Sequence, residues 1–269
     1  MPRKHPASNA SGGVTCFGVG EGWPCADRNH SSFLFRFGET HFLFDAGDGL
    51  SSTYKATGPG YDRVDRVFLS HMHSDHVGGF SLFVQGLWLE RRRRALPVHM
   101  PGKAIPAMRA WLQATVLFED LVGFPIYWEP LGDNIPIRDA GVTVFPYTTT
   151  HLESLRRAFE KTHKTTCFEA FGFVMEGHGK RVAYTADIGH PDDIDRLLAA
   201  PLDLFLCEAS HVPLHDLLHK LRGKAIGKVV FTHLERNLWA SQETMRRDAK
   251  AVLGEIPFVI AKDGDEFAF

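Results

Sequence analysis

The sequence predicts an α+β fold in which two mixed β-sheets pack face to face and helices cover the outside. Short apolar runs typical of strands come in consecutive groups, and longer helical patterns lie between and after them. A chain of 269 residues is long enough to form one large domain. We expect a flexible N-terminal tail over residues 1–12 and a single domain over residues 13–269.

The first half of the chain is expected to form one group of strands and two helices. Gly38 and Glu39 separate two apolar runs, which predicts an antiparallel pair over residues 31–38 and 40–47. Further strands are predicted over residues 13–19, 65–71, 96–101 and 124–131. Helices are predicted over residues 79–94 and 103–117.

The second half of the chain repeats this alternation of short apolar strands and longer helices without repeating the sequence. Strands are predicted over residues 141–151, 168–176, 180–187, 202–209 and 228–234. Helices are predicted over residues 192–200, 213–222 and 241–253, the last with a helix cap formed by Ser241 and Glu243. Residues 258–269 predict a closing hairpin that turns at Asp263 and Gly264.

Charge and composition argue against several classes of protein. The net charge of −2 gives no bulk attraction to nucleic acid or to a membrane surface. The four cysteines form no CxxC pair, so we expect reduced thiols in a cytoplasmic protein. No apolar run approaches the roughly 18 residues that a membrane span needs, and the first dozen residues lack the apolar core of a signal peptide.

The stretch HMHSDH, residues 71–76, concentrates metal-ligand side chains directly after an apolar strand. If that strand continues, His71 and His73 point to the same side, and Asp75 and His76 lie in the turn that opens the next helix. Neutral imidazole and carboxylate are the usual zinc ligands, so the stretch predicts a metal site. The alternative is a helix cap at Asp75 beside polar histidines at a strand end.

Three other apolar strands end in a single residue of the same kind. His151 follows PYTTT, Asp187 follows VAYTA and His233 follows VVFT. Each of these residues alone is typical of a solvated strand end. Together with HMHSDH they supply the ligands that the predicted metal site still lacks.

The ordered set of LFDAG with Asp45, HMHSDH, and the three single residues resembles the metallo-β-lactamase superfamily, over nearly the whole chain from Gly13. The resemblance implies a four-layer αββα sandwich, the metallo-β-lactamase fold. It also implies two ligand groups with Asp187 as a bridge: His71, His73 and His151 for one metal ion, and Asp75, His76 and His233 for the other. Asp45 would lie behind the ligands and orient one of them.

The histidine at position 73 bears on the identity of the metal. The di-iron oxidoreductase branch of the superfamily usually has a glutamate there, so His73 favours zinc and hydrolysis, with manganese or iron as alternatives. Two divalent ions can share a hydroxide at neutral pH, because coordination lowers the pKa of water toward about 7. With Asp75 and Asp187 as ligands, the two cations leave a small positive charge, which favours an anionic substrate.

Two segments resemble the ribonuclease Z and phosphodiesterase branch: FGVGEGWPCADRNHSSFLF and LDLFLCEASH. The resemblance implies that Glu208 supports a proton-donating His211, which makes Asp75, Glu208 and His211 the catalytic set. Cys207 stands where the branch usually has a histidine. The absence of a long Gly- and Lys-rich arm, and of a serine after His233, argues against transfer-RNA processing.

The leading hypothesis is therefore a dinuclear metal-dependent hydrolase of a phosphodiester, either a small molecule or RNA, that uses a metal-bridging hydroxide. The alternatives are a hydrolase of a carboxylic ester, lactone or thioester on the same metal pair, a metal-binding protein without turnover, and a di-iron oxidoreductase. Pairing of exposed sandwich faces would give a homodimer.

Three surface features leave alternatives open. Residues 152–169 form either a lid whose basic side chains meet phosphate oxygens or a solvated segment. The run from Arg91 to Arg94 is either a favourable end to a helix or a nucleic-acid patch. The aromatic residues Trp23, Phe124 and Trp128 either line the cleft or belong to the core.

Overall fold

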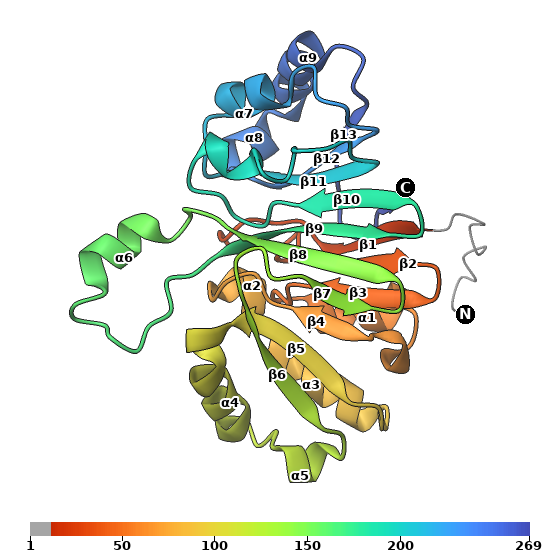
Figure 1. Ribbon diagram of the computed structural model, residues 1–269, viewed down its shortest axis with the longest axis vertical. Helices are drawn as coiled ribbons and strands as arrows, with labels where there is room; N and C mark the ends of the chain where they lie inside the picture. The colour runs from red at the N-terminus through yellow and green to blue at the C-terminus, as the bar shows by residue number, and fades with distance from the viewer. Residues whose placement is uncertain (1–11) are drawn as a thin grey trace.

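The computed structural model describes residues 12–269, in which two seven-stranded sheets form the centre of the molecule (Figure 1). The first sheet contains, in spatial order, β14 (Glu266–Ala268), β1 (Gly12–Gly18), β2 (Ser32–Phe37), β3 (Thr40–Phe44), β4 (Arg66–Phe68), β5 (Leu96–Pro101) and β6 (Ile126–Leu131). Neighbours from β14 to β3 are antiparallel, and neighbours from β3 to β6 are parallel. The predicted pair over residues 31–38 and 40–47 is therefore confirmed as β2 and β3.

The second sheet has the same mixed design. It contains, in spatial order, β13 (Phe258–Ile260), β12 (Val229–Leu234), β11 (Leu204–Ala209), β10 (Lys180–Tyr184), β9 (Phe171–Gly177), β8 (Val142–Thr148) and β7 (Ile137–Asp139). Neighbours from β13 to β10 are parallel, and neighbours from β10 to β7 are antiparallel. Two mixed sheets are thus what the sequence predicted.

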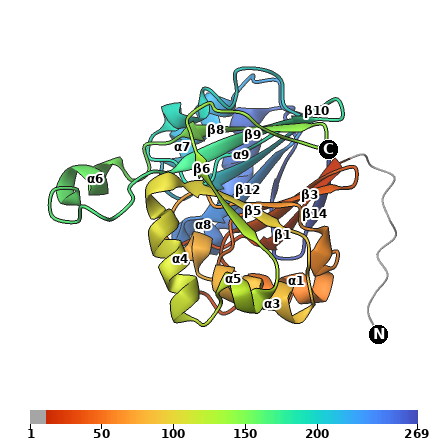
Figure 2. The same ribbon diagram turned by 60° about the horizontal axis from the view of Figure 1, so that its bottom comes forward.

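Helices cover the outer face of each sheet and complete four layers. The helices against the first sheet are α1 (Leu50–Thr57), α2 (Ser74–Val77), α3 (Phe80–Leu89), α4 (Ile105–Ala114) and α5 (Glu119–Val122), of which α1 and α3 run along its outer side in Figure 2. The second sheet carries α7 (Leu214–Leu221), α8 (Arg236–Ala240) and α9 (Gln242–Leu253). Of the helices within residues 12–269, none has the length and apolar content needed to cross a bilayer.

Strand alternation explains why β2 and β3 are apolar on both sides. Phe33, Phe35 and Phe37 face the core between the sheets, whereas Leu34 faces the helices. Phe44 of β3 meets Phe173 of β9 at a centroid distance of 5.0 Å, edge to face. Such aromatic pairs contribute about 0.5–1.5 kcal/mol beyond their buried area, so they help hold the two sheets in one arrangement.

The predicted helix over residues 192–200 is wrong. Only a single 3₁₀ turn, Pro191–Ile194, forms there, and turns follow it. The Asp193 carboxylate accepts hydrogen bonds from the backbone N–H groups of Thr150 and Gly189, at 2.9 and 2.8 Å. Such side-chain bonds to backbone compete with regular helix, which explains why the helical spacing of the leucines did not decide the local structure.

The predicted C-terminal hairpin is also wrong, because its two strands belong to different sheets. β13 pairs in parallel with β12, and β14 pairs antiparallel with β1. The turn at Asp263 and Gly264 exists, but it carries the chain from one sheet to the other. Asp263 anchors this turn to the first sheet, since its carboxylate accepts from Val19 N at 3.0 Å and Asn29 N at 2.6 Å.

Other predicted boundaries move by a few residues. Ser241 does precede α9, but its hydroxyl donates to Asn237 O rather than to the helix N-terminus. Residues 1–11 of the predicted tail lie outside the described residues, and Gly12 begins β1. The segment after His151 forms α6 (Glu153–Phe159), which buries none of its residues and extends away from both sheets (Figure 1, Figure 2). This placement favours the solvated alternative over a closed lid.

The basic run from Arg91 to Arg94 contains a core residue. Arg92 is only 1% exposed, and its guanidinium donates to the carbonyl oxygens of Arg94, Tyr61 and Ala95 at 2.9, 3.1 and 2.8 Å. A continuous nucleic-acid patch is therefore not formed, because the second of the four cations points inward.

Arg92→Met is expected to lower the free energy of unfolding by about 3 kcal/mol, because the carbonyl oxygens of Tyr61, Arg94 and Ala95 lose the buried guanidinium that donates to them. Urea denaturation measures this change. The matched variant Arg93→Met, which alters an exposed neighbour, should stay within about 0.5 kcal/mol of the parent chain. Equal effects of the two substitutions would contradict the structural role of Arg92.

Candidate metal centre

The predicted site residues lie at strand ends of both sheets, in the loops that follow them and in the short helix α2. The elements that position them are β3 for Asp45, β4 and α2 for residues 71–76, β8 for His151, β10 for Asp187, β11 for Glu208 and β12 for His233. β4 ends at Phe68, so the strand predicted over residues 65–71 does not continue to His71 and His73, which lie in the segment after it. Parallel pairing of β3 with β4, of β10 with β11, and of β11 with β12 brings these strand ends to the same edges.

Three positions at or next to these strand ends have backbone conformations that residues with side chains rarely adopt. The angle φ is 56° at Asp45, 45° at Ala186 and 48° at His233. Such conformations cost about 1–3 kcal/mol each and persist only where the surroundings hold them. Asp45 N donates to Phe68 O at 2.8 Å and His233 N donates to Val19 O at 2.7 Å, so contacts between neighbouring segments hold the strained turns.

Asp187 lies at the centre of the cluster, and its two carboxylate oxygens face different histidines. Oδ2 is 3.6 Å from His71 Nε2 and 3.5 Å from His151 Nε2. Oδ1 is 3.1 Å from His76 Nε2 and 3.5 Å from His233 Nε2. One carboxylate therefore joins two groups of imidazoles.

The other two predicted ligands complete these groups. His73 Nδ1 lies 3.1 Å from His151 Nε2, and Asp75 Oδ2 lies 3.2 Å from His233 Nε2. Within each group the ligand-type atoms lie no more than 4.8 Å apart. The structure thus brings all seven side chains of the predicted ligand set into one cluster.

Several buried atoms of the cluster fit a bound cation. Among residues 12–269, His71 Nε2, His76 Nε2 and both oxygens of Asp187 have no partner with hydrogen-bond geometry. Buried polar atoms are normally satisfied, because an unsatisfied one costs about 1–3 kcal/mol. Imidazole nitrogens and carboxylate oxygens directed at common points are the donor set of zinc and related divalent ions, so these residues suit metal binding.

Burial and neighbouring charges set the protonation states in the cluster. Burial holds the pKa of His71 well below its ordinary value and lowers the pKa of His151 to about 3. Burial also acts to raise the pKa of Asp187, but His233 and His76 outweigh it and hold that pKa well below its ordinary value. Burial acts to lower the pKa of His76, but Asp187 and Asp45 outweigh it and raise that pKa well above its ordinary value, so in the absence of a cation this ring carries positive charge at the place a cation would take. Neutral imidazole and ionised carboxylate are the forms that bind metal ions.

Asp45 lies behind His76 and fixes the orientation of its ring. Asp45 Oδ2 accepts from His76 Nδ1 at 2.7 Å, from Ser70 Oγ at 2.9 Å and from Tyr184 OH at 2.7 Å. Because Nδ1–H is used in this way, the lone pair of His76 Nε2 is directed at the cluster. Sequence reasoning found Asp45 but missed Ser70 and Tyr184, although Ser70 directly precedes His71 and Tyr184 lies three residues before Asp187.

Glu208 holds the ring of His211 at the open side of the cluster. Glu208 Oε1 accepts from His211 Nδ1 at 2.9 Å, and the ring centroid of His211 lies 4.4 Å from that of His151. Burial acts to lower the pKa of His211, but the bond to Glu208 outweighs it and raises the pKa to about 9. The ring therefore keeps a proton at neutral pH, and its Nε2 is free to donate. The His211 side chain is 32% exposed, whereas Glu208 is 1% exposed.

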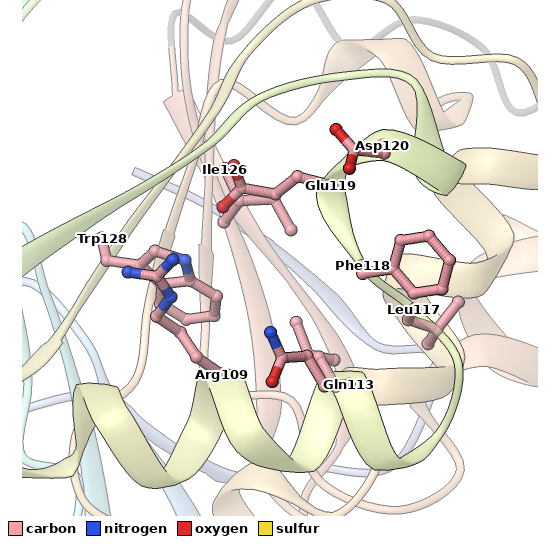
Figure 3. Close-up of a pocket in the computed structure, with 9 residues that line it drawn as sticks. Arg109, Gln113, Leu117, Phe118, Glu119, Asp120, Ile126 and Trp128 are labelled. Carbon is pink, nitrogen blue, oxygen red and sulfur yellow. The ribbon is translucent and has the colours of Figure 1, made fainter.

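The three aromatic residues with open alternatives have different places. Phe124 is buried in the core under the first sheet, and Trp128 packs against that core. Trp128 also lines a pocket of about 220 Å³ between α4, α5 and β6, together with Arg109 and Gln113 of α4 (Figure 3). None of the residues that line this pocket belongs to the histidine cluster. Trp23 is exposed and lies in the loop beside Asp75.

Comparison with known proteins places these observations in a family. Residues 40–234 match the family model described as Beta-lactamase superfamily domain. Ribonuclease Z of Bradyrhizobium sp. (strain ORS 278) is 37% identical over 139 residues, which cover 51% of this chain and 45% of that protein. The probable metallo-hydrolase YhfI of Bacillus subtilis (strain 168) is 26% identical over 267 residues, which cover 93% of this chain and 97% of that protein. This chain spans about half the length of the ribonuclease Z proteins it matches.

Solved structures share the fold. The crystal structure of the metallo-β-lactamase fold protein YhfI from Bacillus subtilis has a TM-score of 0.77 at 20% identity, covering 97% of this chain and 100% of that chain. The crystal structure of human tRNase Z, short form, has a TM-score of 0.66 at 16% identity, and the match covers 95% of this chain and 98% of that chain. The predicted metallo-β-lactamase fold is therefore confirmed. Because the family model spans more than half of the sequence, and includes every side chain of the cluster, this chain belongs to the β-lactamase superfamily.

Proposed function

We propose that this protein is a metal-dependent hydrolase of phosphodiesters with two divalent cations, preferably zinc, around Asp187. The observation that carries the proposal is the division of the Asp187 carboxylate, whose oxygens each face two imidazole nitrogens at 3.1–3.6 Å. The residues that would hold the cations are His71, His73 and His151 on one side, Asp75, His76 and His233 on the other, and Asp187 between them. Such cations, when bound, lower the pKa of water toward about 7 and neutralise charge on a phosphoryl oxygen.

The surrounding residues have defined tasks in this proposal. Asp45 keeps His76 in the tautomer that exposes Nε2 to the cluster. Glu208 holds His211 through Nδ1, so that Nε2–H of His211 donates the proton that the leaving oxygen requires. Asp75 completes the catalytic set as a carboxylate beside His233. Each of these groups is fixed before substrate binds, because its partners are buried hydrogen-bonding groups.

A phosphodiester substrate is favoured by two arguments. A phosphodiester is an anion, and a site with two dications and the protonated His211 attracts negative charge. Ribonuclease Z, the name of several relatives, denotes an enzyme that cleaves phosphodiester bonds of RNA. The proposed substrate is accordingly a phosphodiester of a small molecule or of RNA.

Metal analysis and a substrate panel test the proposal. The purified chain should contain about two zinc or manganese ions and should cleave bis(4-nitrophenyl) phosphate faster than a lactone or a thioester, and a chelator should abolish cleavage. His73→Ala should lose metal and turnover, whereas His163→Ala, an exposed histidine outside the cluster, should retain both. Preferred cleavage of the lactone or thioester would reject the phosphodiester assignment, and turnover without metal would reject the metal centre.

A further inference from the structure

The loop between β1 and β2 lies against the cluster and carries an exposed aromatic ring. A Cβ added to Gly22 would lie 3.3 Å from Asp75 Oδ2, so the backbone just before Trp23 lies against a residue of the ligand set. Trp23 itself is 57% exposed, which is unusual for the largest apolar side chain. An exposed ring one residue from the chemistry is therefore a candidate contact for substrate.

A guanidinium supports the Trp23 ring from behind. The Cζ atom of Arg236 lies 4.4 Å from the centroid of the Trp23 ring. Arg236 begins α8, three residues after His233, so both members of this stack start from chain segments that form the cluster. No ion pair or hydrogen bond involves the Arg236 side chain within residues 12–269, which leaves its charge to interact with the ring and with bound anions.

The loop that carries Trp23 is held in place by several contacts. Gly20 N donates to Asn29 O at 2.8 Å and closes the loop at its base. Asp263 accepts from the backbone N–H groups on both sides of that base, Val19 and Asn29. Trp23 N donates to the carboxylate of Glu21, which is 9% exposed. The backbone of Trp23 is thus fixed while its ring stays open, which lowers the entropy lost when a ligand binds.

A second arginine–tryptophan pair in the same region gives an internal comparison. Arg28 Cζ lies 4.4 Å from the ring centroid of Trp239 and ties the loop to α8. The Arg28 side chain is 19% exposed and pairs with Asp27 at 2.8 Å, so this stack is closed and structural. The pair of Trp23 and Arg236 has the same distance of 4.4 Å between guanidinium and ring centroid, but the Trp23 ring stays accessible.

We propose that Trp23, backed by Arg236, is a specificity-determining platform on which a planar aromatic ring of the substrate stacks. The substrate class becomes phosphodiesters in which the group that stays bonded to phosphorus, and not the leaving group, carries such a ring, so the inference rests on the proposed function. Stacking of a ring on an aromatic side chain contributes about 1–3 kcal/mol, which corresponds to a change in affinity of roughly 5- to 150-fold.

Two pairs of probes test the platform. Methyl 4-nitrophenyl phosphate and phenyl 4-nitrophenyl phosphate share the 4-nitrophenolate leaving group. They differ only in the group that stays on phosphorus, which is methyl in one and phenyl in the other. Methylphosphonate and phenylphosphonate are not hydrolysed, so calorimetry of their binding to the metal-loaded protein reports stacking without turnover. For the parent chain we expect a KM about tenfold lower for the phenyl ester than for the methyl ester, and a Kd about tenfold lower for phenylphosphonate than for methylphosphonate.

Trp23→Ala should remove the preference for both phenyl compounds and leave the methyl compounds unchanged. Trp23→Phe, which keeps a ring, should restore most of the preference. Tyr127→Ala, which removes a 52% exposed ring on β6, is the matched control and should behave like the parent chain.

Equal losses of Trp23→Ala on methyl and phenyl compounds would show a structural role and overturn the platform, as would a preference that persists in Trp23→Ala. Absence of any phenyl preference in the parent chain would overturn it too. If the parent chain binds phenylphosphonate about tenfold more tightly than methylphosphonate but hydrolyses neither ester, the platform stands and the proposed function fails.

Discussion

Asp187→Asn is expected to release metal from both halves of the cluster and to reduce kcat/KM by at least about 10³-fold. The carboxylate faces two groups of histidines with different oxygens, so its loss affects both groups at once. A neutral amide carries no negative charge, and metal ions contribute several kcal/mol of transition-state stabilisation, with about 1.4 kcal/mol for each tenfold in rate. Metal content after gel filtration, measured with turnover of bis(4-nitrophenyl) phosphate, gives both quantities.

Asp75→Asn is the matched comparison, because Asp75 belongs to one group only. Its Oδ2 lies 3.2 Å from His233 Nε2 and 3.5 Å from His76 Nε2. This variant should keep about one metal ion per chain, whereas Asp187→Asn should keep fewer. Loss of the same single ion in both variants would mean that Asp187 serves one site and does not bridge.

Local patterns identified the residues of the cluster better than they predicted how those residues reach one another. HMHSDH carries its signal in six adjacent positions, and each later ligand follows an apolar strand, so neither requires knowledge of the packing. The bond from Tyr184 to Asp45 joins residues 139 positions apart, and no pattern around Tyr184 distinguishes it from an ordinary core tyrosine. Contacts of this kind depend on the pairing of two sheets, which periodicity does not specify.

The wrong predictions have the same physical origin. An Asp-Gly turn between two short strands is a hairpin signal, yet Asp263 bonds to Val19 and Asn29 and sends the last strand to the other sheet. The run of four arginines indicated either a favourable helix end or a nucleic-acid patch, yet three carbonyl oxygens hold the Arg92 side chain inside the protein. For Asp263 the deciding partners are distant in sequence, and for Arg92 the distant Tyr61 acts together with the nearby carbonyl oxygens of Arg94 and Ala95.

His211→Ala is expected to impair cleavage more strongly as the departing oxygen becomes more basic. A general acid contributes about 10²–10⁴-fold when the leaving oxygen needs a proton, and far less when that oxygen is already a stable anion. Phosphodiesters that release 4-nitrophenolate, 4-chlorophenolate or phenolate give a graded series with one reaction mechanism. The parent chain should show a shallow decline of kcat along this series, and His211→Ala should show a steep one.

Glu208→Gln separates the acid from the group that positions it. A glutamine oxygen can still accept from His211 Nδ1, but without the charge that raises the pKa of the ring, so the decline along the series should be intermediate. His215→Ala, on an imidazole that is 75% exposed, should match the parent chain throughout. A loss of equal size for 4-nitrophenolate and phenolate would mean that His211 binds the substrate rather than protonating it, because a binding contact is insensitive to the basicity of the departing oxygen. The slope of the series, and not the size of the loss, therefore decides whether Glu208 and His211 act as a proton-donating pair.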